Sequence, residues 1–126
     1  MIKTKRRTIE LKINFPKIVC LCGSTRFMEA FQEANLRETL ARNIVLSVGC
    51  NTKSDESLGL LAAVKVRLDE LHKRKIDLAD EILVLNVGGY IGESTLSEIK
   101  YAQEHEKPIR FLEPVKPAHF FLERVD

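Results

Sequence analysis

The chain has 126 residues, of which 44% are hydrophobic and 30% charged, with 20 basic residues against 18 acidic ones. This length and composition are those of one globular domain with a hydrophobic core, and they exclude a disordered chain. We therefore expect a single domain over residues 1–126. No apolar run approaches the roughly 20 residues that cross a bilayer, and the basic N-terminus has no apolar segment behind it. We expect a cytoplasmic protein without a membrane partner, and the balanced charge and the absence of tryptophan argue against nucleic-acid binding.

Five segments of the chain are predicted strands. Residues 8–15 alternate apolar and polar side chains, which predicts a half-exposed edge strand inside an N-terminal extension, 1–16, that Pro16 interrupts. Residues 17–22 and 81–87 are apolar runs typical of strands buried on both faces. Residues 44–49 and 107–113 complete the set of predicted strands.

The predicted helices alternate with these strands. They span residues 26–42, a segment that begins after Asp55 or Ser57 and continues to residue 80, residues 94–106, and a short terminal helix over 118–125. Apolar residues recur at helical spacing in the first two and predict their buried faces: Phe27, Ala30, Phe31, Ala34, Leu36 and Leu40, then Leu61, Val64, Leu68, Leu71, Ile76 and Leu78. Alternating strands and helices predict an α/β fold, a small doubly wound, Rossmann- or flavodoxin-like three-layer domain with a mainly parallel sheet.

Three cysteines, an odd number, occur without the spacing of metal ligands. Cys20 and Cys22 are two residues apart in a predicted strand, so their side chains share one face of the sheet. We interpret them as small reduced core residues rather than as redox or metal-binding groups. The sequence therefore predicts no metal site and no cofactor.

A first candidate loop, "CGSTRF", connects a buried strand to a helix. Gly23 allows a tight turn and close approach of a ligand. Ser24 or Thr25 is suited to cap the following helix, whose free N–H groups favour an anion. Arg26 is suited to pair with a phosphate or carboxylate. The alternative is an ordinary capped turn with no ligand.

A second candidate loop, "NVGGYIGEST", also follows a buried strand and contains Gly88, Gly89 and Gly92. The role of Glu98 in this loop has two interpretations. Thr95 and Glu98 match the capping box, in which the glutamate bonds to the N-cap amide. If Ser94 is the N-cap instead, Glu98 is left for catalysis as a nucleophile or base. In doubly wound folds both loops lie at the ligand-binding edge of the sheet, the carboxyl ends of the strands.

Several motifs together resemble the nucleoside 2-deoxyribosyltransferase-like superfamily, which includes the deoxynucleoside 5′-monophosphate N-glycosidases. They are "CGSTRF", "LADEILVL" and the glycine-rich loop with "GESTLSEIKYA", and the resemblance covers residues 18–112. The positions that match the family's motifs are Gly23, Ser24, Ala79, Asp80, Gly92, Thr95, Glu98 and Ala102.

The resemblance implies a catalytic role for Glu98, as the nucleophile that attacks C1′ of the sugar and releases the base. Water or a second base then resolves the glycosyl-enzyme. It also implies a homo-oligomer, a dimer or larger, in which residues 118–125 are a candidate interface. The expected substrate-binding residues are Cys22, Gly23, Ser24, Thr25, Arg26, Asp77, Gly88, Gly89, Gly92, Ser94 and Thr95.

The chain departs from the family pattern in two places. Where the family usually has an aspartate, eight residues before the aspartate of "AD", this chain has His72. His72 is either the acid that protonates the leaving base or a surface residue without a role. Ile99 and Lys100 replace the residues expected after the glutamate, which implies a changed pocket access or substrate.

A non-catalytic nucleotide sensor of Rossmann-like fold is the alternative function. "GGYIGESTLSE" also resembles the glycine-rich segment of lysine-decarboxylase-like phosphoribohydrolases and their sensor relatives, without its proline. Binding without turnover distinguishes the sensor from the enzyme.

Overall fold

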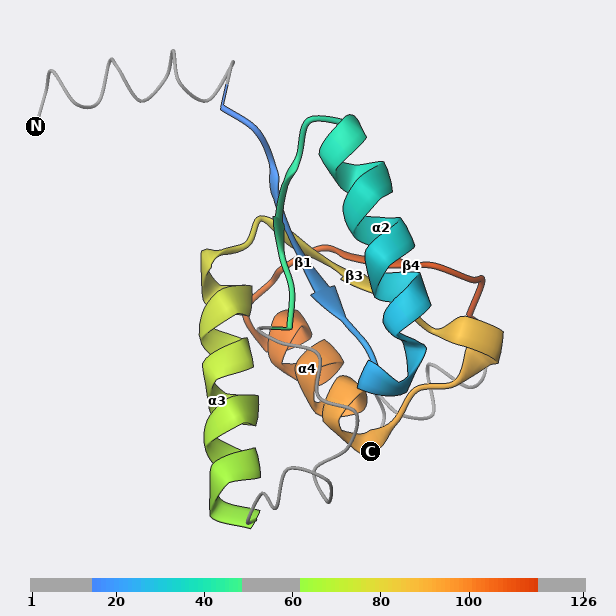
Figure 1. Ribbon diagram of the computed structural model, residues 1–126. Helices are drawn as coiled ribbons and strands as arrows, with labels where there is room; N and C mark the ends of the chain where they lie inside the picture. The colour runs from blue at the N-terminus through green and yellow to red at the C-terminus, as the bar shows by residue number, and fades with distance from the viewer. Residues whose placement is uncertain (1–14, 49–61, 116–126) are drawn as a thin grey trace, which may run out of the picture.

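A computed structural model of the chain describes residues 15–48 and 62–115 (Figure 1). Its elements in chain order are β1 (Ile18–Cys22), the 3-10 turn η1 (Thr25–Phe27), α2 (Met28–Leu40), β2 (Ile44–Leu46), α3 (Ala62–Leu78), β3 (Glu81–Val84), the 3-10 turn η2 (Val87–Gly89), α4 (Glu93–Glu104) and β4 (Ile109–Phe111). The four predicted strands that follow Pro16 are present, and each is shorter than predicted. The predicted edge strand except its last residue, the first part of the second helix and the terminal helix lie outside the described residues.

The four strands form one parallel sheet in the order β2-β1-β3-β4. The connection through α2 leads from β1 to one edge, and the connections through α3 and α4 lead to the other, so the sheet is doubly wound. Helix α2 covers one face, and α3 and α4 lie on the opposite face (Figure 1). The predicted α/β three-layer fold is therefore confirmed.

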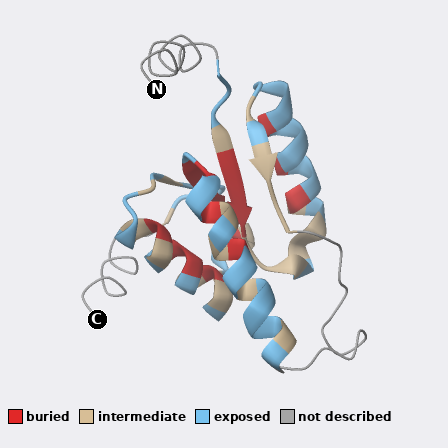
Figure 2. Ribbon diagram, turned by 90° about the vertical axis from the view of Figure 1, so that its left-hand side faces the viewer, coloured by how far each residue is buried: buried red, intermediate tan, exposed pale blue. Residues whose placement is uncertain are grey.

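The central strands bury side chains on both faces, as their continuous apolar sequence predicts. In β1, Val19 and Leu21 pack with Phe31 and Ala34 of α2. Cys20 and Cys22 point to the other face, where they pack with α3 and α4. Figure 2 shows this strand buried beyond its start, whereas the outer surfaces of the helices are exposed. The shared face of the two cysteines was predicted correctly.

The predicted buried faces of two helices are wrong in part. Leu36 and Leu40 are exposed on α2, which packs on the sheet through Phe31 and Ala34. On α3, Leu68, Leu71 and Leu78 are exposed, whereas Ile76 is buried as predicted, together with His72, which the predicted stripe left out. The apolar pattern therefore predicted too wide a buried face for α3.

A polar network closes the end of the sheet opposite the two candidate loops. Arg110 of β4 forms ion pairs with Glu38 near the end of α2 and with Glu81 at the start of β3. Lys17 adds a second cation at 3.3 Å from Glu81. Among the described residues, no helix combines the length and apolar character needed to cross a membrane.

Candidate functional site

A cavity of about 360 Å³ opens at the carboxyl ends of the strands, where β1 and β3 lie side by side. This is the point at which the chain winds to opposite faces of the sheet, the usual ligand site of such folds. The loop after β1 supplies Gly23, Ser24 and Thr25, and the start of α4 supplies Gly92, Ser94, Thr95 and Glu98. The structure thus brings the two predicted loops to one cavity.

Backbone geometry fixes the first loop. The Ser24 hydroxyl accepts a hydrogen bond from the Arg26 N–H at 3.3 Å, so Ser24 caps the turn η1. The prediction that Ser24 or Thr25 caps the following helix is wrong, because η1 intervenes and α2 begins after Phe27 without a side-chain cap. Gly23 lies so close to β3 that a Cβ atom would come within 3.2 Å of Leu85 Cβ and 3.3 Å of Leu85 O. Glycine at this position therefore allows the cavity floor to form.

The second loop corrects the prediction for Glu98. Helix α4 begins at Glu93 with Gly92 as its N-cap, whose backbone is extended. Thr95 therefore lies inside the first turn and Glu98 in the second. Neither the capping box of Thr95 and Glu98 nor Ser94 as N-cap is correct, because the helix starts earlier than either arrangement requires. The Glu98 carboxylate has no capping role and lines the cavity.

The Glu98 side chain is buried, with only 8% of its surface exposed. Burial raises the pKa of Glu98 to about 7, although nearby His72 and a hydrogen bond with the Cys22 thiol act in the opposite direction. Among the described residues, no lysine or arginine forms an ion pair with it. Near neutral pH, Glu98 therefore exchanges between a neutral acid and a buried anion.

His72 is buried beside Glu98, so its interpretation as a surface residue is wrong. Its Nε2 atom lies 3.1 Å from Leu21 O, 3.6 Å from Cys20 Sγ and 3.7 Å from Cys22 Sγ. Burial lowers the pKa of His72, but the Cys20 hydrogen bond and the Glu98 charge outweigh it, and the net shift is upward. The ring also lines the cavity.

Several predicted binding residues are not among those that line the cavity. Asp77 instead accepts a hydrogen bond from the Tyr101 hydroxyl at 2.6 Å. Gly88 and Gly89 form a turn with positive φ, and the Gly88 N–H donates to Glu113 at 3.0 Å. The remaining residues of this kind are Cys22, which lies buried beneath the cavity, and Arg26, whose guanidinium stacks on the Tyr90 ring at 4.5 Å.

The two departures after Glu98 also lie away from the cavity lining. Ile99 packs in the core between α4 and the sheet, and Lys100 is exposed. Neither is among the residues that line the cavity.

Apart from His72, sequence reasoning missed one wall of the cavity, which α3 provides. This wall contains Lys65, Leu68, Asp69, Leu71, His72 and Lys75. Lys75 Nζ donates to Ser47 O at 2.6 Å, which ties α3 to the segment after β2. Lys65, Asp69 and His72 follow one another at helical spacing, a signal that identifies this wall once His72 is taken to mark the face of α3 that lines the cavity.

Comparisons of the chain with protein-family models, with curated proteins and with solved structures each found no match. The function is therefore argued from the geometry of the cavity.

Proposed function

We propose that the protein binds a nucleoside or nucleotide in this cavity and cleaves or transfers its N-glycosidic bond, with Glu98 as the nucleophile. One observation carries the proposal: a buried glutamate without a cationic ion-pair partner among the described residues lines a cavity between two strand-end loops. A carboxylate held in this way is costly to the fold, which is typical of a group retained for chemistry. The resemblance to the nucleoside 2-deoxyribosyltransferase-like superfamily gives the same residue this role.

The chemistry requires two displacements at one carbon. The Glu98 carboxylate attacks C1′, the bond from C1′ to the base nitrogen breaks, and its electron pair leaves with the base. Water then attacks C1′ of the glycosyl ester, which restores the carboxylate and releases the sugar. A second base in place of water gives transfer instead of hydrolysis.

Two neighbours of Glu98 are suited to protonate the leaving base. The Nε2 atom of His72 is directed at the cysteines, whereas Nδ1 has no hydrogen-bond partner among the described residues. Asp69 lines the same cavity and is 3.8 Å from Lys65. We favour His72, because it is held rigidly by burial and its raised pKa keeps more of it protonated near neutral pH.

Positive charge at the cavity supports an anionic substrate. Lys65 and Lys75 line it on α3, and the N–H groups at the start of α4 face the same space. Together with the loop Gly23–Thr25, they are suited to a sugar that carries a 5′-phosphate. We therefore expect monophosphates to react better than nucleosides.

The test is incubation with nucleosides and their 5′-monophosphates, with free base measured by chromatography. Glu98→Ala and Glu98→Gln should lower turnover by at least about 10³-fold, the scale on which loss of a nucleophile acts. Glu104→Gln, at the exposed far end of the same helix, is the matched control and should retain activity. Intact-mass detection of a sugar adduct with a 2′-fluoro substrate should depend on Glu98. Undiminished turnover in Glu98→Ala would remove this residue from the mechanism.

A nucleotide sensor without turnover is the second candidate. It is favoured by the small exposure of Glu98 and by the hydrogen bond with Cys22, both of which hold the carboxyl away from a ligand. Calorimetry that gives a micromolar dissociation constant, with no base released from any substrate, selects the sensor.

We also propose that the protein is a cytoplasmic homo-oligomer. Leu68 and Leu71 are about half exposed at the cavity wall, where a second copy would cover them. Light scattering gives the mass in solution, and Leu71→Glu should shift an oligomer toward the monomer. A monomeric wild-type chain contradicts the proposal.

A further inference from the structure

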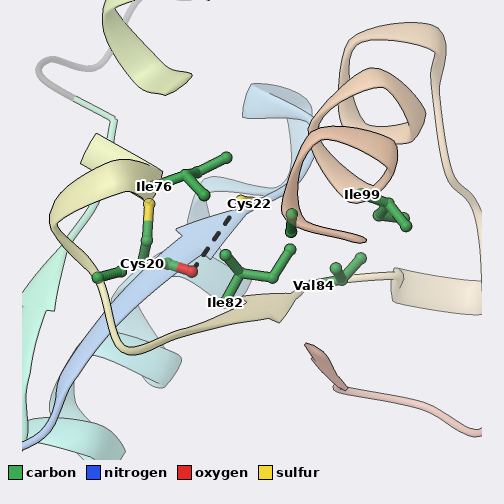
Figure 3. Close-up of a cluster of buried hydrophobic side chains, with 8 residues drawn as sticks. Cys20, Cys22, Ile76, Ile82, Val84 and Ile99 are labelled. Atoms are coloured by element: carbon green, nitrogen blue, oxygen red, sulfur yellow. Dashed lines mark hydrogen bonds between the residues drawn. The ribbon is translucent and has the colours of Figure 1, made fainter. Parts of the chain in front are cut away.

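Three soft donor atoms converge beneath the cavity. They are Cys20 Sγ, Cys22 Sγ and a ring nitrogen of His72, and all of them lie within 4.8 Å of one another. All three residues are buried. Figure 3 shows that both sulfur atoms leave β1 on the same side of the sheet, among isoleucine and valine side chains. The mainly apolar core thus contains two cysteine thiols and a histidine ring that lie close together.

The spacing of these atoms is that of a tetrahedral metal site. With Zn–S near 2.3 Å and Zn–N near 2.0–2.1 Å, tetrahedral angles place S and N about 3.5 Å apart and two S atoms about 3.8 Å apart. The two measured distances from His72 Nε2 to the sulfurs are 3.6 and 3.7 Å. An ion therefore fits between the three atoms with little movement of β1 or α3.

We propose that Cys20, Cys22 and His72 form a binding site for a thiophilic divalent ion of the Zn²⁺ class. Two thiolates and one imidazole match the preference of Zn²⁺ for sulfur and nitrogen ligands. The fourth position is left to a further group on the side of His72 and Glu98, which both line the cavity, and Glu98 lies beside Cys22. Three protein ligands and one open position are the arrangement of zinc sites that exchange ligands.

Ion binding changes the hydrogen bonding of His72. The Nε2 atom must present its lone pair to the ion, so the contact with Leu21 O at 3.1 Å is given up and Nδ1 carries the ring proton. Each thiol releases its proton to solvent as it becomes a ligand. The proposal does not depend on the proposed glycosidase function. When the ion is bound, His72 is one of its ligands and Glu98 lies beside the cation.

The sequence conceals this site. Two cysteines separated by one residue and a histidine 50 positions later do not match the usual zinc-binding patterns, so the sequence predicted no metal. Only the packing of α3 against β1 brings His72 to the two sulfurs. The structure thus supports an inference that the sequence opposes.

The test is direct metal binding by the reduced full-length chain. Zn²⁺ is added, excess ion is removed by gel filtration, and the bound amount is measured by mass spectrometry of the elements. We expect about one Zn²⁺ per chain, and Co²⁺ in its place should give thiolate charge-transfer bands and tetrahedral visible bands. Zn²⁺ should also raise the melting temperature, because an ion that binds the native chain stabilises it.

Matched variants assign the ligands. Cys20→Ser, Cys22→Ser and His72→Gln should each weaken Zn²⁺ binding at least about 10-fold, since loss of even an outer-shell partner has that effect. Cys50→Ser, whose position lies outside the described residues, and His105→Gln, which is exposed on the surface, should bind as the wild type does. Far-ultraviolet circular dichroism checks folding. Cys20→Ala or Cys22→Ala replaces the serine variant at the same position if that variant fails to fold. Absence of retained Zn²⁺ in the wild type, or loss of binding in Cys50→Ser alone, overturns the proposal.

Discussion

Two buried glutamates, Glu38 and Glu98, lie at opposite ends of the sheet and differ in their partners. Their exposed fractions are similar, 5% and 8%. Glu38 accepts hydrogen bonds from the Arg110 guanidinium at 2.9 and 3.2 Å and from Asn43 at 2.9 Å. Those of Arg110 are the main reason that the pKa of Glu38 is lowered. Within residues 15–48 and 62–115, Glu98 has no such lysine or arginine, and burial raises its pKa to about 7.

The difference separates a structural carboxylate from one that we propose to be functional. A buried charge with a bidentate arginine recovers much of its desolvation cost, so Glu38 joins α2 to β4. A buried carboxyl without that partner costs stability whenever it ionises. Its position at a cavity, rather than its burial, is what makes Glu98 a candidate for chemistry.

Removal of the cation should have the largest effect on this comparison. Arg110→Met leaves both Glu38 and Glu81 buried without the guanidinium that joins them. The two carboxylates are buried but the Arg110 side chain is 43% exposed, so we expect the free energy of unfolding to fall by about 2 kcal/mol, less than breaking a fully buried ion pair costs. Chemical denaturation at pH 7 measures it.

Arg74→Met is the matched control for Arg110→Met. Arg74 also pairs with two carboxylates, Glu70 and Asp77, but all three side chains are substantially exposed. Its loss should change the free energy of unfolding by less than about 1 kcal/mol. Equal effects of the two substitutions would contradict the structural role given to the network at Glu38.

Neutralising Glu98 should have the opposite sign. Glu98→Gln removes a buried charge, so we expect the free energy of unfolding at pH 8 to rise by about 2 kcal/mol. This figure converts the pKa shift at about 1.4 kcal/mol per unit and is reduced for burial of the amide. Denaturation is measured at pH 4 and at pH 8 in buffer freed of metal. Glu104→Gln, exposed on the same helix, should change little at either pH.

The pH dependence of this gain follows from the raised pKa. Between the ordinary value of 4.5 and about 7, the folded chain holds a proton on Glu98 that the unfolded chain has released. The contribution of Glu98 to stability is therefore full below pH 4.5 and is lost as the pH rises through 7. The advantage of Glu98→Gln should vanish at pH 4, and a gain that is equal at both pH values would show that charge burial is not its cause.

The fold was predictable because its signals are local. The apolar runs of β1 and β3 and the polar, glycine-containing turns after them predict buried parallel strands without any knowledge of tertiary contacts. The faces of the helices were less predictable. Leu71 and His72 are adjacent on α3, and the hydrophobic choice between them is the wrong one, because packing against β1 selects His72.

The candidate site was predictable only in its loops. Gly23 and Gly92 could be placed at the cavity, because strand ends of a doubly wound sheet meet at one edge. Lys75, Asp69 and the contact of His72 with the cysteines could not, because they depend on the rotation of α3 about its own axis. The capping box failed for a related reason: it matched a common local motif two residues inside a helix that begins at Glu93.

Loss of a single hydrogen bond to Glu38 should have the smallest effect on stability among these predictions. Asn43→Ala removes the amide that donates to Glu38 Oε1, and we expect the free energy of unfolding to fall by about 1 kcal/mol at pH 7. This bond helps to lower the pKa of Glu38, so its contribution is present above pH 4.5 and is lost as the pH falls through the folded value. The difference between variant and wild type should therefore shrink in acid, the reverse of the behaviour expected for Glu98→Gln.

Asn35→Ala, which removes an exposed bond from Thr39 on the same helix as Glu38, is the control and should show a smaller loss without this pH dependence. A loss for Asn43→Ala that stays constant down to pH 3 would mean that the amide stabilises the loop after α2 rather than the Glu38 carboxylate.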